Sequence, residues 1–100
     1  YQFELRPFTK VVKLKLNLYP NQGKNVSHAE HADIYDKGEP DKRIITSVFN
    51  FHTCNGATVI GGKKIESKAN RLILFDNTLH HGITQSDIPR RIVLNMNVLK

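Results

Sequence analysis

The chain is poor in cysteine, lacks tryptophan and has no long apolar run. Its 100 residues include one cysteine, Cys54, so no disulfide can form within the chain and disulfide-stapled secreted folds are excluded. A lone thiol suits a reducing compartment, and we expect a cytoplasmic location. No stretch approaches the roughly 18 apolar residues of a membrane span, and the start shows no signal-peptide pattern. We therefore expect no membrane partner.

Acidic residues are also scarce, with 9 Asp and Glu against 15 Lys and Arg and a net charge of +6. Such a charge is compatible with a nucleic acid, an acidic substrate or an anionic co-substrate. The lysines are scattered along the chain, which is equally typical of a soluble surface. We find no aromatic platform for stacking bases, so we expect no nucleic-acid partner.

The sequence also lacks a stretch in which apolar residues recur every 3.6 positions, as in an amphipathic helix. Apolar residues instead recur mainly at every second position. From Val12 to Tyr19, apolar side chains alternate with Lys, Asn and Tyr, which predicts a strand with one apolar and one polar face. Composition and turn signals predict further strands at Arg43–Phe51, Ala57–Ile60, a return through Ile65 after the Gly61-Gly62 turn, Arg71–Phe75 and Arg90–Val98. The stretch Asp76–Pro89 reads as a loop except around its two histidines.

Six or seven short strands without a helix predict an all-β sandwich or barrel. The length fits a single domain over residues 1–100. The chain opens in mid-pattern without Met, so it could be a fragment of a longer protein.

The residues that could carry chemistry are histidines and one nearby carboxylate. His31 and Asp33 are two positions apart, so in an extended segment they project from the same face. His80 and His81 follow a predicted strand. Two imidazoles and a carboxylate on one side of an octahedral metal leave positions open, as an O2-activating Fe(II) centre requires. Taken alone, His-x-Asp is a weak signal, and without further context a hydrogen-bonded pair at a loop edge is the better explanation of it.

Two arginines open the last predicted strand. A guanidinium there could bind one end of a dicarboxylate while the other end chelates the metal. Because neighbours on a strand alternate, one of the two faces solvent. We expect Arg91 to point inward, with Arg90 as the alternative.

These pieces occur in an order that resembles the Fe(II)/2-oxoglutarate-dependent oxygenases. The resemblance is closest to the prolyl-4-hydroxylase-like branch and its small phage-carried members, and it spans about residues 11–98. It rests on Leu18–Gly23, His31-x-Asp33, Arg43–Phe49, Asn55-Gly56, Asn70–Asp76, His81 and Arg90–Leu94.

The resemblance implies a double-stranded β-helix (jelly roll) in which His31, Asp33 and His81 bind Fe(II). It further implies that Arg91 binds the distal carboxylate of 2-oxoglutarate and that Tyr19 lines the co-substrate pocket. Asn50 stands where many relatives carry a co-substrate-binding Tyr. The N-terminal helices that usually support the larger sheet in such enzymes are not found in this sequence.

Two assignments stay open at this stage. His28-Ala29-Glu30 is a second His-x-acid motif that could replace the first. His80 could replace His81, although the family's usual count of six positions after Phe75 favours His81.

The implied activity is hydroxylation of a C–H bond with Fe(II), 2-oxoglutarate and O2. The prime substrate would be a peptide or a small molecule, with a prolyl side chain as the analogy, and the location would be the host cytoplasm for a phage-encoded chain. The alternatives are a metal-free jelly-roll binding or structural module, and a cupin-like metal enzyme that does not use 2-oxoglutarate. Nucleic-acid dealkylation is compatible with the positive charge of the chain. It is disfavoured because we find no aromatic platform on which bases could stack.

Overall fold

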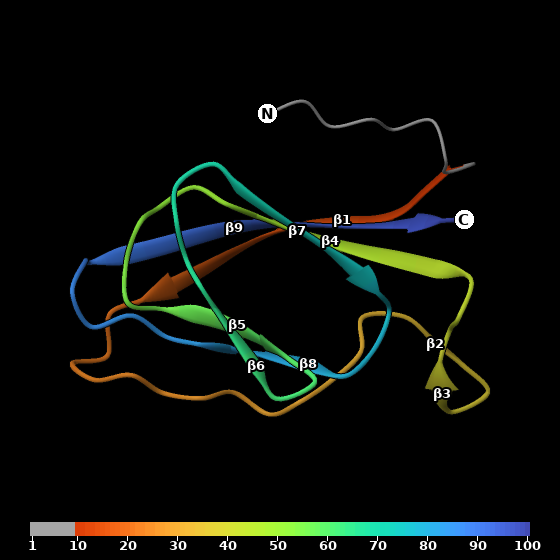
Figure 1. The fold of residues 1–100 in the computed structure, drawn as a ribbon, viewed down its shortest axis with the longest axis horizontal. Helices are drawn as coiled ribbons and strands as arrows, with labels where there is room; N and C mark the ends of the chain where they lie inside the picture. The colour runs from red at the N-terminus through yellow and green to blue at the C-terminus, as the bar shows by residue number, and fades with distance from the viewer. Residues whose placement is uncertain (1–9) are drawn as a thin grey trace.

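A computed structural model describes residues 10–100, and among these residues all regular structure is β-strand (Figure 1). The nine strands are β1 (Lys10–Pro20), β2 (Tyr35–Asp36), β3 (Glu39–Pro40), β4 (Ile44–Asn50), β5 (Ala57–Ile60), β6 (Lys63–Glu66), β7 (Arg71–Asp76), β8 (His80–Ile83) and β9 (Arg90–Leu99). The all-β prediction is confirmed. Within residues 10–100 we find no helix that is long and apolar enough to cross a membrane.

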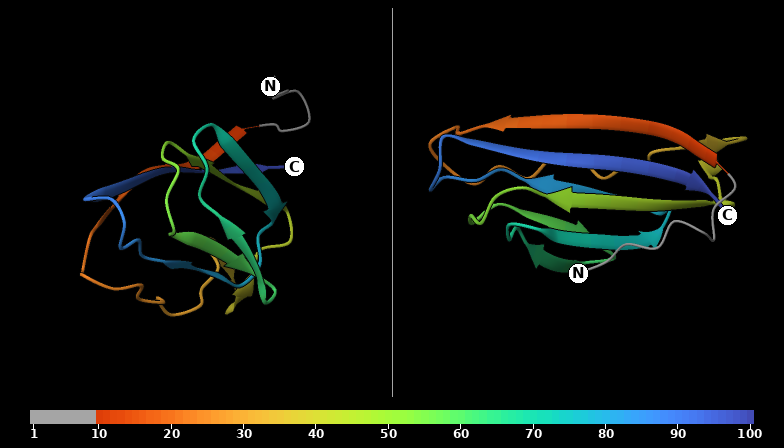
Figure 2. Two further views of the ribbon diagram at one scale, coloured as in Figure 1. Left: turned by 60° about the vertical axis from the view of Figure 1, so that its left-hand side comes forward. Right: turned by 90° about the horizontal axis from the view of Figure 1, so that it is seen from above.

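Two antiparallel sheets face each other (Figure 2). The larger has the strand order β1-β9-β4-β7, and the smaller has the order β6-β5-β8. Isolated bridges from Ser27 to Ile83 and from His31 to His80 add the segment 27–31 to the free edge of β8. From β4 onward the chain thus passes back and forth between the larger and the smaller sheet. This is the arrangement of a double-stranded β-helix.

The apolar core is small and lies between the sheets. It is centred on Val48, Ile73 and Val93, with Tyr19, Ile60, Ile65 and Phe75 packed against them. Many of the largest fully buried side chains are polar: Arg91, Gln85, Asn50, Asn97, Thr46, Thr84 and Ser67. Buried polar groups are costly unless they find partners. Most of these side chains do find partners, as in the hydrogen bonds of Thr46 to Asn97 and of Gln85 to the Tyr19 carbonyl.

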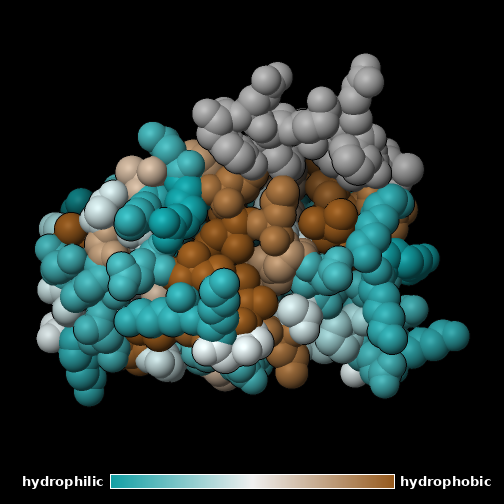
Figure 3. Space-filling view, in the orientation of Figure 1, coloured by the Kyte–Doolittle hydropathy of each residue, from teal (hydrophilic) through white to brown (hydrophobic). Residues whose placement is uncertain are grey.

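Strand β1 is amphipathic as predicted, but its apolar face points away from the other sheet. Leu14, Leu16 and Leu18 are 62%, 64% and 59% exposed. The alternating positions Lys13 and Lys15 line a cavity on the inner side. Apolar side chains also form a broad area in the middle of the face shown in Figure 3. The inward direction of the lysines is the opposite of what hydrophobic burial alone would produce.

The predicted strands agree with the structure to within one or two residues, whereas β8 and the short pair β2–β3 were missed. The Gly61-Gly62 turn joins β5 to β6 with φ values of 56° and 79°, which only glycine adopts readily. Strand β8 has four residues, including two His and one Gly, and so carries no strand signal of its own. It forms because β5 on one side and the segment 27–31 on the other supply its hydrogen-bond partners.

Candidate metal centre

The centre of the candidate site is a pair of histidines that face each other across two backbone segments. The His31 N–H donates to the His80 carbonyl at 2.9 Å, and the His80 N–H donates to the His31 carbonyl at 2.8 Å. Their rings lie 4.7 Å apart between centroids. Backbone pairing therefore sets the separation of the two imidazoles before any ligand binds.

Asp33 completes a group of three side chains. Its Oδ1 lies 3.5 Å from Nε2 of His31 and 3.4 Å from Nε2 of His80. One potential ligand atom from each residue lies within 4.8 Å of the other two. The expected pair His31 and Asp33 is thus brought together, and the third member of the group is His80.

His81, which is expected from the sequence as the third ligand, is not one of the three side chains whose ligand atoms converge. Its Nδ1 is 3.6 Å from a carboxylate oxygen of Glu30. The physical reason is the register of β8 on β5, where Ile60 pairs with His80 and Val59 with His81. Neighbouring positions on a strand face opposite sides, so this register sends only His80 toward Asp33.

Both imidazoles of the group are held in the tautomer that a metal ligand needs. His80 Nδ1 lies 2.8 Å from the Thr78 carbonyl, and His31 Nδ1 lies 3.2 Å from the Ala29 carbonyl. A carbonyl can only accept, so each Nδ1 carries the proton and each Nε2 keeps its lone pair. A metal-bound histidine commonly donates its second ring N–H to a backbone carbonyl in this way.

Asp33 and His80 each shift the pKa of the other toward the charged form. Burial tends to raise the pKa of Asp33, but the contacts with His80, the hydrogen bond with the Asn97 side chain and the nearby His31 together lower it. For His80, burial tends to lower the pKa, whereas Asp33 and the Thr78 carbonyl raise it, and the net shift is upward.

Nε2 of His80 and Oδ2 of Asp33 are buried and lack a well-aligned hydrogen bond within residues 10–100. Two imidazole nitrogens and a carboxylate with unused lone pairs are a donor set suited to Fe(II). The residues present therefore fit a divalent metal.

Asn77, which the sequence analysis did not single out, supports the ligand segment. This residue is 4% exposed. Its Oδ1 accepts from the backbone N–H of Asp33 at 3.1 Å and of Ile34 at 3.4 Å. Its Nδ2 donates to the carbonyls of Ile34 at 2.6 Å and Asp41 at 3.1 Å. A single amide thus ties the loop before β8 to the segment that carries Asp33.

Arg91 lies inside the barrel, as expected, and Arg90 is exposed. Arg91 is 1% exposed, and its guanidinium makes only long contacts of 3.3–3.5 Å with Asn50 Oδ1, Thr58 Oγ1 and the carbonyls of Ala57 and Ile83. Burial lowers its pKa, and no ion pair to it is found among residues 10–100. A buried cation without a counter-ion is unstable in isolation, so this position suits an anionic ligand.

Tyr19 and Asn50 both contact Arg91. The guanidinium carbon lies 5.3 Å from the centroid of the Tyr19 ring, within cation–π range. Asn50 is 1% exposed and accepts from the guanidinium at 3.3 Å while donating to the Arg71 carbonyl at 3.0 Å. A narrow cavity of about 40 Å³ is lined by Tyr19 and Arg91 together with His31, His80 and His81. It connects the metal-binding group to the arginine.

The second His-x-acid motif does not form a comparable group. His28 packs against Tyr19, with 5.6 Å between the ring centroids, and Glu30 contacts His81. His52 accepts a hydrogen bond from the Ser67 hydroxyl through its backbone carbonyl. Of the alternatives left open by the sequence, only His80 joins His31 and Asp33.

Comparison with known families decides the classification. Residues 14–99 match the model of the 2OG-Fe(II) oxygenase superfamily. The chain belongs to this superfamily. The description of the superfamily names Fe(II) and 2-oxoglutarate as the metal and co-substrate of its members.

Similar solved structures agree on the fold. A cupin protein from Bacteroides fragilis is 17% identical with a TM-score of 0.57, and the match covers 86% of this chain and 64% of the cupin chain. KdgF from Halomonas sp. is 8% identical with a TM-score of 0.52, covering 98% of this chain and 84% of its own. Our chain thus spans less than two thirds of that cupin. No curated protein matches the sequence. At these identities the likeness shows the jelly-roll fold alone.

Proposed function

We propose that this superfamily member is a dioxygenase that hydroxylates a C–H bond of its prime substrate, with His31, Asp33 and His80 as the Fe(II) ligands. The observation that carries the proposal is the convergence of two Nε2 lone pairs and one carboxylate within 4.8 Å, close to a buried arginine. When bound, Fe(II) and 2-oxoglutarate supply the oxidation by O2, with release of succinate and CO2.

The chain's own residues prepare this site for the metal. The carbonyls of Ala29 and Thr78 hold the two imidazole protons on the far side of each ring. The lowered pKa of Asp33 keeps its carboxylate ionised near neutral pH. The Asp33 carboxylate is thus already ionised, whereas the raised pKa of His80 means that a metal must displace a proton from this imidazole.

Arg91 is the proposed partner of the distal carboxylate of 2-oxoglutarate. A guanidinium binds a carboxylate through two parallel N–H donors, and the buried Nε–H of Arg91 has no hydrogen-bond partner among residues 10–100. Asn50 and Tyr19 hold its position. Because the connecting cavity measures only about 40 Å³, entry of the co-substrate requires side chains such as Tyr19 to move.

The prime substrate is proposed only by class. A prolyl side chain in a peptide is the analogy offered by the resemblance to prolyl-4-hydroxylase-like enzymes, and a small molecule is the alternative. We propose a cytoplasmic location, since the single Cys54 is a free thiol.

The first test uses the metal and co-substrate alone. Anaerobic addition of Fe(II) and 2-oxoglutarate should produce a metal-to-ligand absorption band in the unaltered protein and none in His31→Ala. Absence of the band in the unaltered protein, with no metal bound in a titration, would leave a metal-free jelly-roll module as the better description.

A second test addresses the co-substrate. Arg91→Ala should bind Fe(II) but lose the band and succinate production at 2-oxoglutarate concentrations that saturate the unaltered protein. Arg90→Ala is the matched control and should retain both, since Arg90 is exposed. Iron binding with no response to 2-oxoglutarate in any variant would instead support a cupin-like metal enzyme.

A further inference from the structure

A second cavity adjoins the metal-binding group on the side away from Arg91. Its volume is about 150 Å³, and its lining is Lys13, Lys15, Asn17, His31, Ala32, Asp33, Asn95 and Asn97. It shares His31, Asn17 and Asn95 with the narrow cavity that reaches Arg91. A molecule in the larger cavity would therefore lie directly beside two of the proposed metal ligands.

The polar wall of this cavity is built by strand pairing. In the β1–β9 ladder, Lys13 pairs with Asn97 and Lys15 with Asn95. Side chains of directly opposite residues lie on the same face of a sheet. Because Leu14 and Leu16 take the outer face, both lysines are directed to the inner face beside the metal-binding group.

Among residues 10–100, no acid pairs with either of the two lysines. The one acidic residue that lines the cavity is Asp33, and its carboxylate is directed at His31 and His80. Two cations and no free anion favour binding of a negatively charged group.

A buried hydrogen-bond donor lies in the same wall. Asn97 is 1% exposed, and its Oδ1 accepts from the Thr46 hydroxyl at 2.9 Å. This contact orients the amide so that its oxygen is already used. Its Nδ2 is buried, and the Asn97 side chain is hydrogen-bonded to Asp33. Asn97 therefore orients one of the proposed metal ligands and leaves the two lysines as the cationic groups of this cavity.

We propose that Lys13 and Lys15 bind an anionic group of the prime substrate, a carboxylate or a phosphate. The inference rests on the proposed oxygenase function, because the bound group would hold the rest of the substrate next to the metal ligands. Arg91 does not line this cavity, so the anion is distinct from 2-oxoglutarate. The substrate class is therefore an acidic molecule rather than a neutral one.

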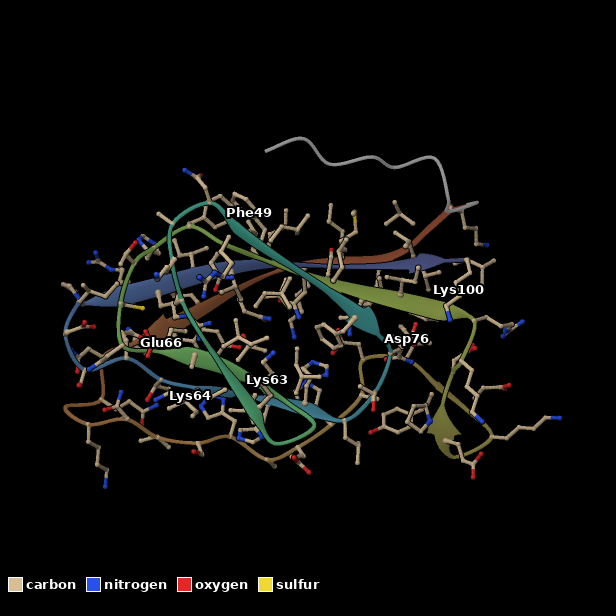
Figure 4. All side chains as sticks on the ribbon, in the orientation of Figure 1. Phe49, Lys63, Lys64, Glu66, Asp76 and Lys100 are labelled. Atoms are coloured by element: carbon tan, nitrogen blue, oxygen red, sulfur yellow. The ribbon has the colours of Figure 1, made fainter. Side chains whose placement is uncertain are left out.

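The test uses protein loaded with Co(II), which does not turn over, and with saturating 2-oxoglutarate. The probe is inorganic phosphate, and trimethyl phosphate is its uncharged counterpart. Binding is followed by isothermal titration calorimetry and by the change in the Co(II) visible spectrum. The variant is Lys13→Gln/Lys15→Gln, and the matched control is Lys63→Gln/Lys64→Gln on β6, which removes the same charge elsewhere (Figure 4).

We expect phosphate to bind the loaded protein and trimethyl phosphate not to bind. Both lysines are exposed, so their attraction for an anion is modest, and the double variant should weaken phosphate binding about tenfold. The control variant should bind as the unaltered protein does. Equal phosphate affinity in the Lys13/Lys15 variant and the unaltered protein would overturn the inference.

Two further results separate this inference from the proposed function. If the Lys13/Lys15 variant loses 2-oxoglutarate binding instead, the lysines serve the co-substrate and the inference is wrong. If the unaltered protein fails to bind Co(II) and 2-oxoglutarate at all, the proposed function fails first. Circular dichroism melting of each variant checks that it is folded before any titration is interpreted.

Discussion

His31 and His80 exchange two backbone hydrogen bonds, of 2.9 and 2.8 Å, and both direct Nε2 toward the same oxygen of Asp33. Residues 49 positions apart in the chain thus meet as one cross-strand pair. The spacing of the proposed metal ligands depends on backbone pairing more than on the flexibility of side chains. Four predictions follow from this arrangement and its surroundings.

His80→Ala should reduce Fe(II) or Co(II) affinity far more than His81→Ala. Removing a ligand should exceed the about 10–100-fold loss typical of groups that only orient a ligand. His81→Ala should fall within or below that range, since His81 contacts Glu30. Metal affinities of the two single variants, measured by competition with a chromophoric chelator, give the answer. The reverse order would restore His81 as the third ligand.

Asn77→Ala should destabilise the fold and weaken metal binding together. The substitution leaves the backbone groups of Asp33, Ile34 and Asp41 without their buried partner. We expect a loss of about 2–4 kcal/mol in the free energy of unfolding, measured with urea. Asp76→Asn is the neighbouring control. Asp76 is exposed and only pairs with Lys100 at 3.2 Å near the chain end (Figure 4), so its loss should cost little.

Gly56→Ala should disturb Arg91. A Cβ at this position would lie 3.0 Å from Cδ of Arg91 and 3.0 Å from the Ile83 carbonyl oxygen. We expect about 1–3 kcal/mol of destabilisation and weaker binding of 2-oxoglutarate, because the guanidinium must shift. Gly82→Ala serves as the stability control, since its nearest contact would be 3.5 Å from the Tyr19 hydroxyl. Unchanged co-substrate affinity in Gly56→Ala would argue against the role of Arg91.

The metal-free protein should gain stability from the Asp33–His80 pair only over a limited pH range. The pKa of Asp33 is lowered on folding, so its contribution is present above the ordinary value of 3.8 and is lost as the pH falls. The pKa of His80 is raised, so its contribution is complete below the ordinary value of 6.5 and is lost as the pH rises. Both contributions coincide between pH 3.8 and 6.5.

Unfolding of metal-free protein and of Asp33→Asn across this range provides the measurement. The stability difference between the two should be largest between pH 3.8 and 6.5 and should shrink on both sides. A difference that does not change with pH would mean that the two side chains do not interact as charges. Bound metal should shift the optimum to higher pH, because the metal competes with the proton on His80.

Short-range patterns in the sequence were sufficient to predict most of the strands. The alternation in Val12–Tyr19 and the apolar run Arg71–Phe75 predict strands that the structure contains, and the Gly61-Gly62 turn is where it was expected. These features depend on period and turn chemistry within a few residues. Strand β8 escaped prediction since its pairing partners lie far away in sequence.

The sequence by itself determined that the chain is all-β, that His31 and Asp33 share one face and that a strand begins at two arginines. The tertiary structure decided three things that adjacent residues leave undetermined: that His80 rather than His81 faces Asp33, that Asn77 holds the ligand segment, and that β1 turns its lysines inward. The alternation of a strand places neighbouring side chains on opposite sides. Only the register of that strand on its partner strands determines which side faces the interior.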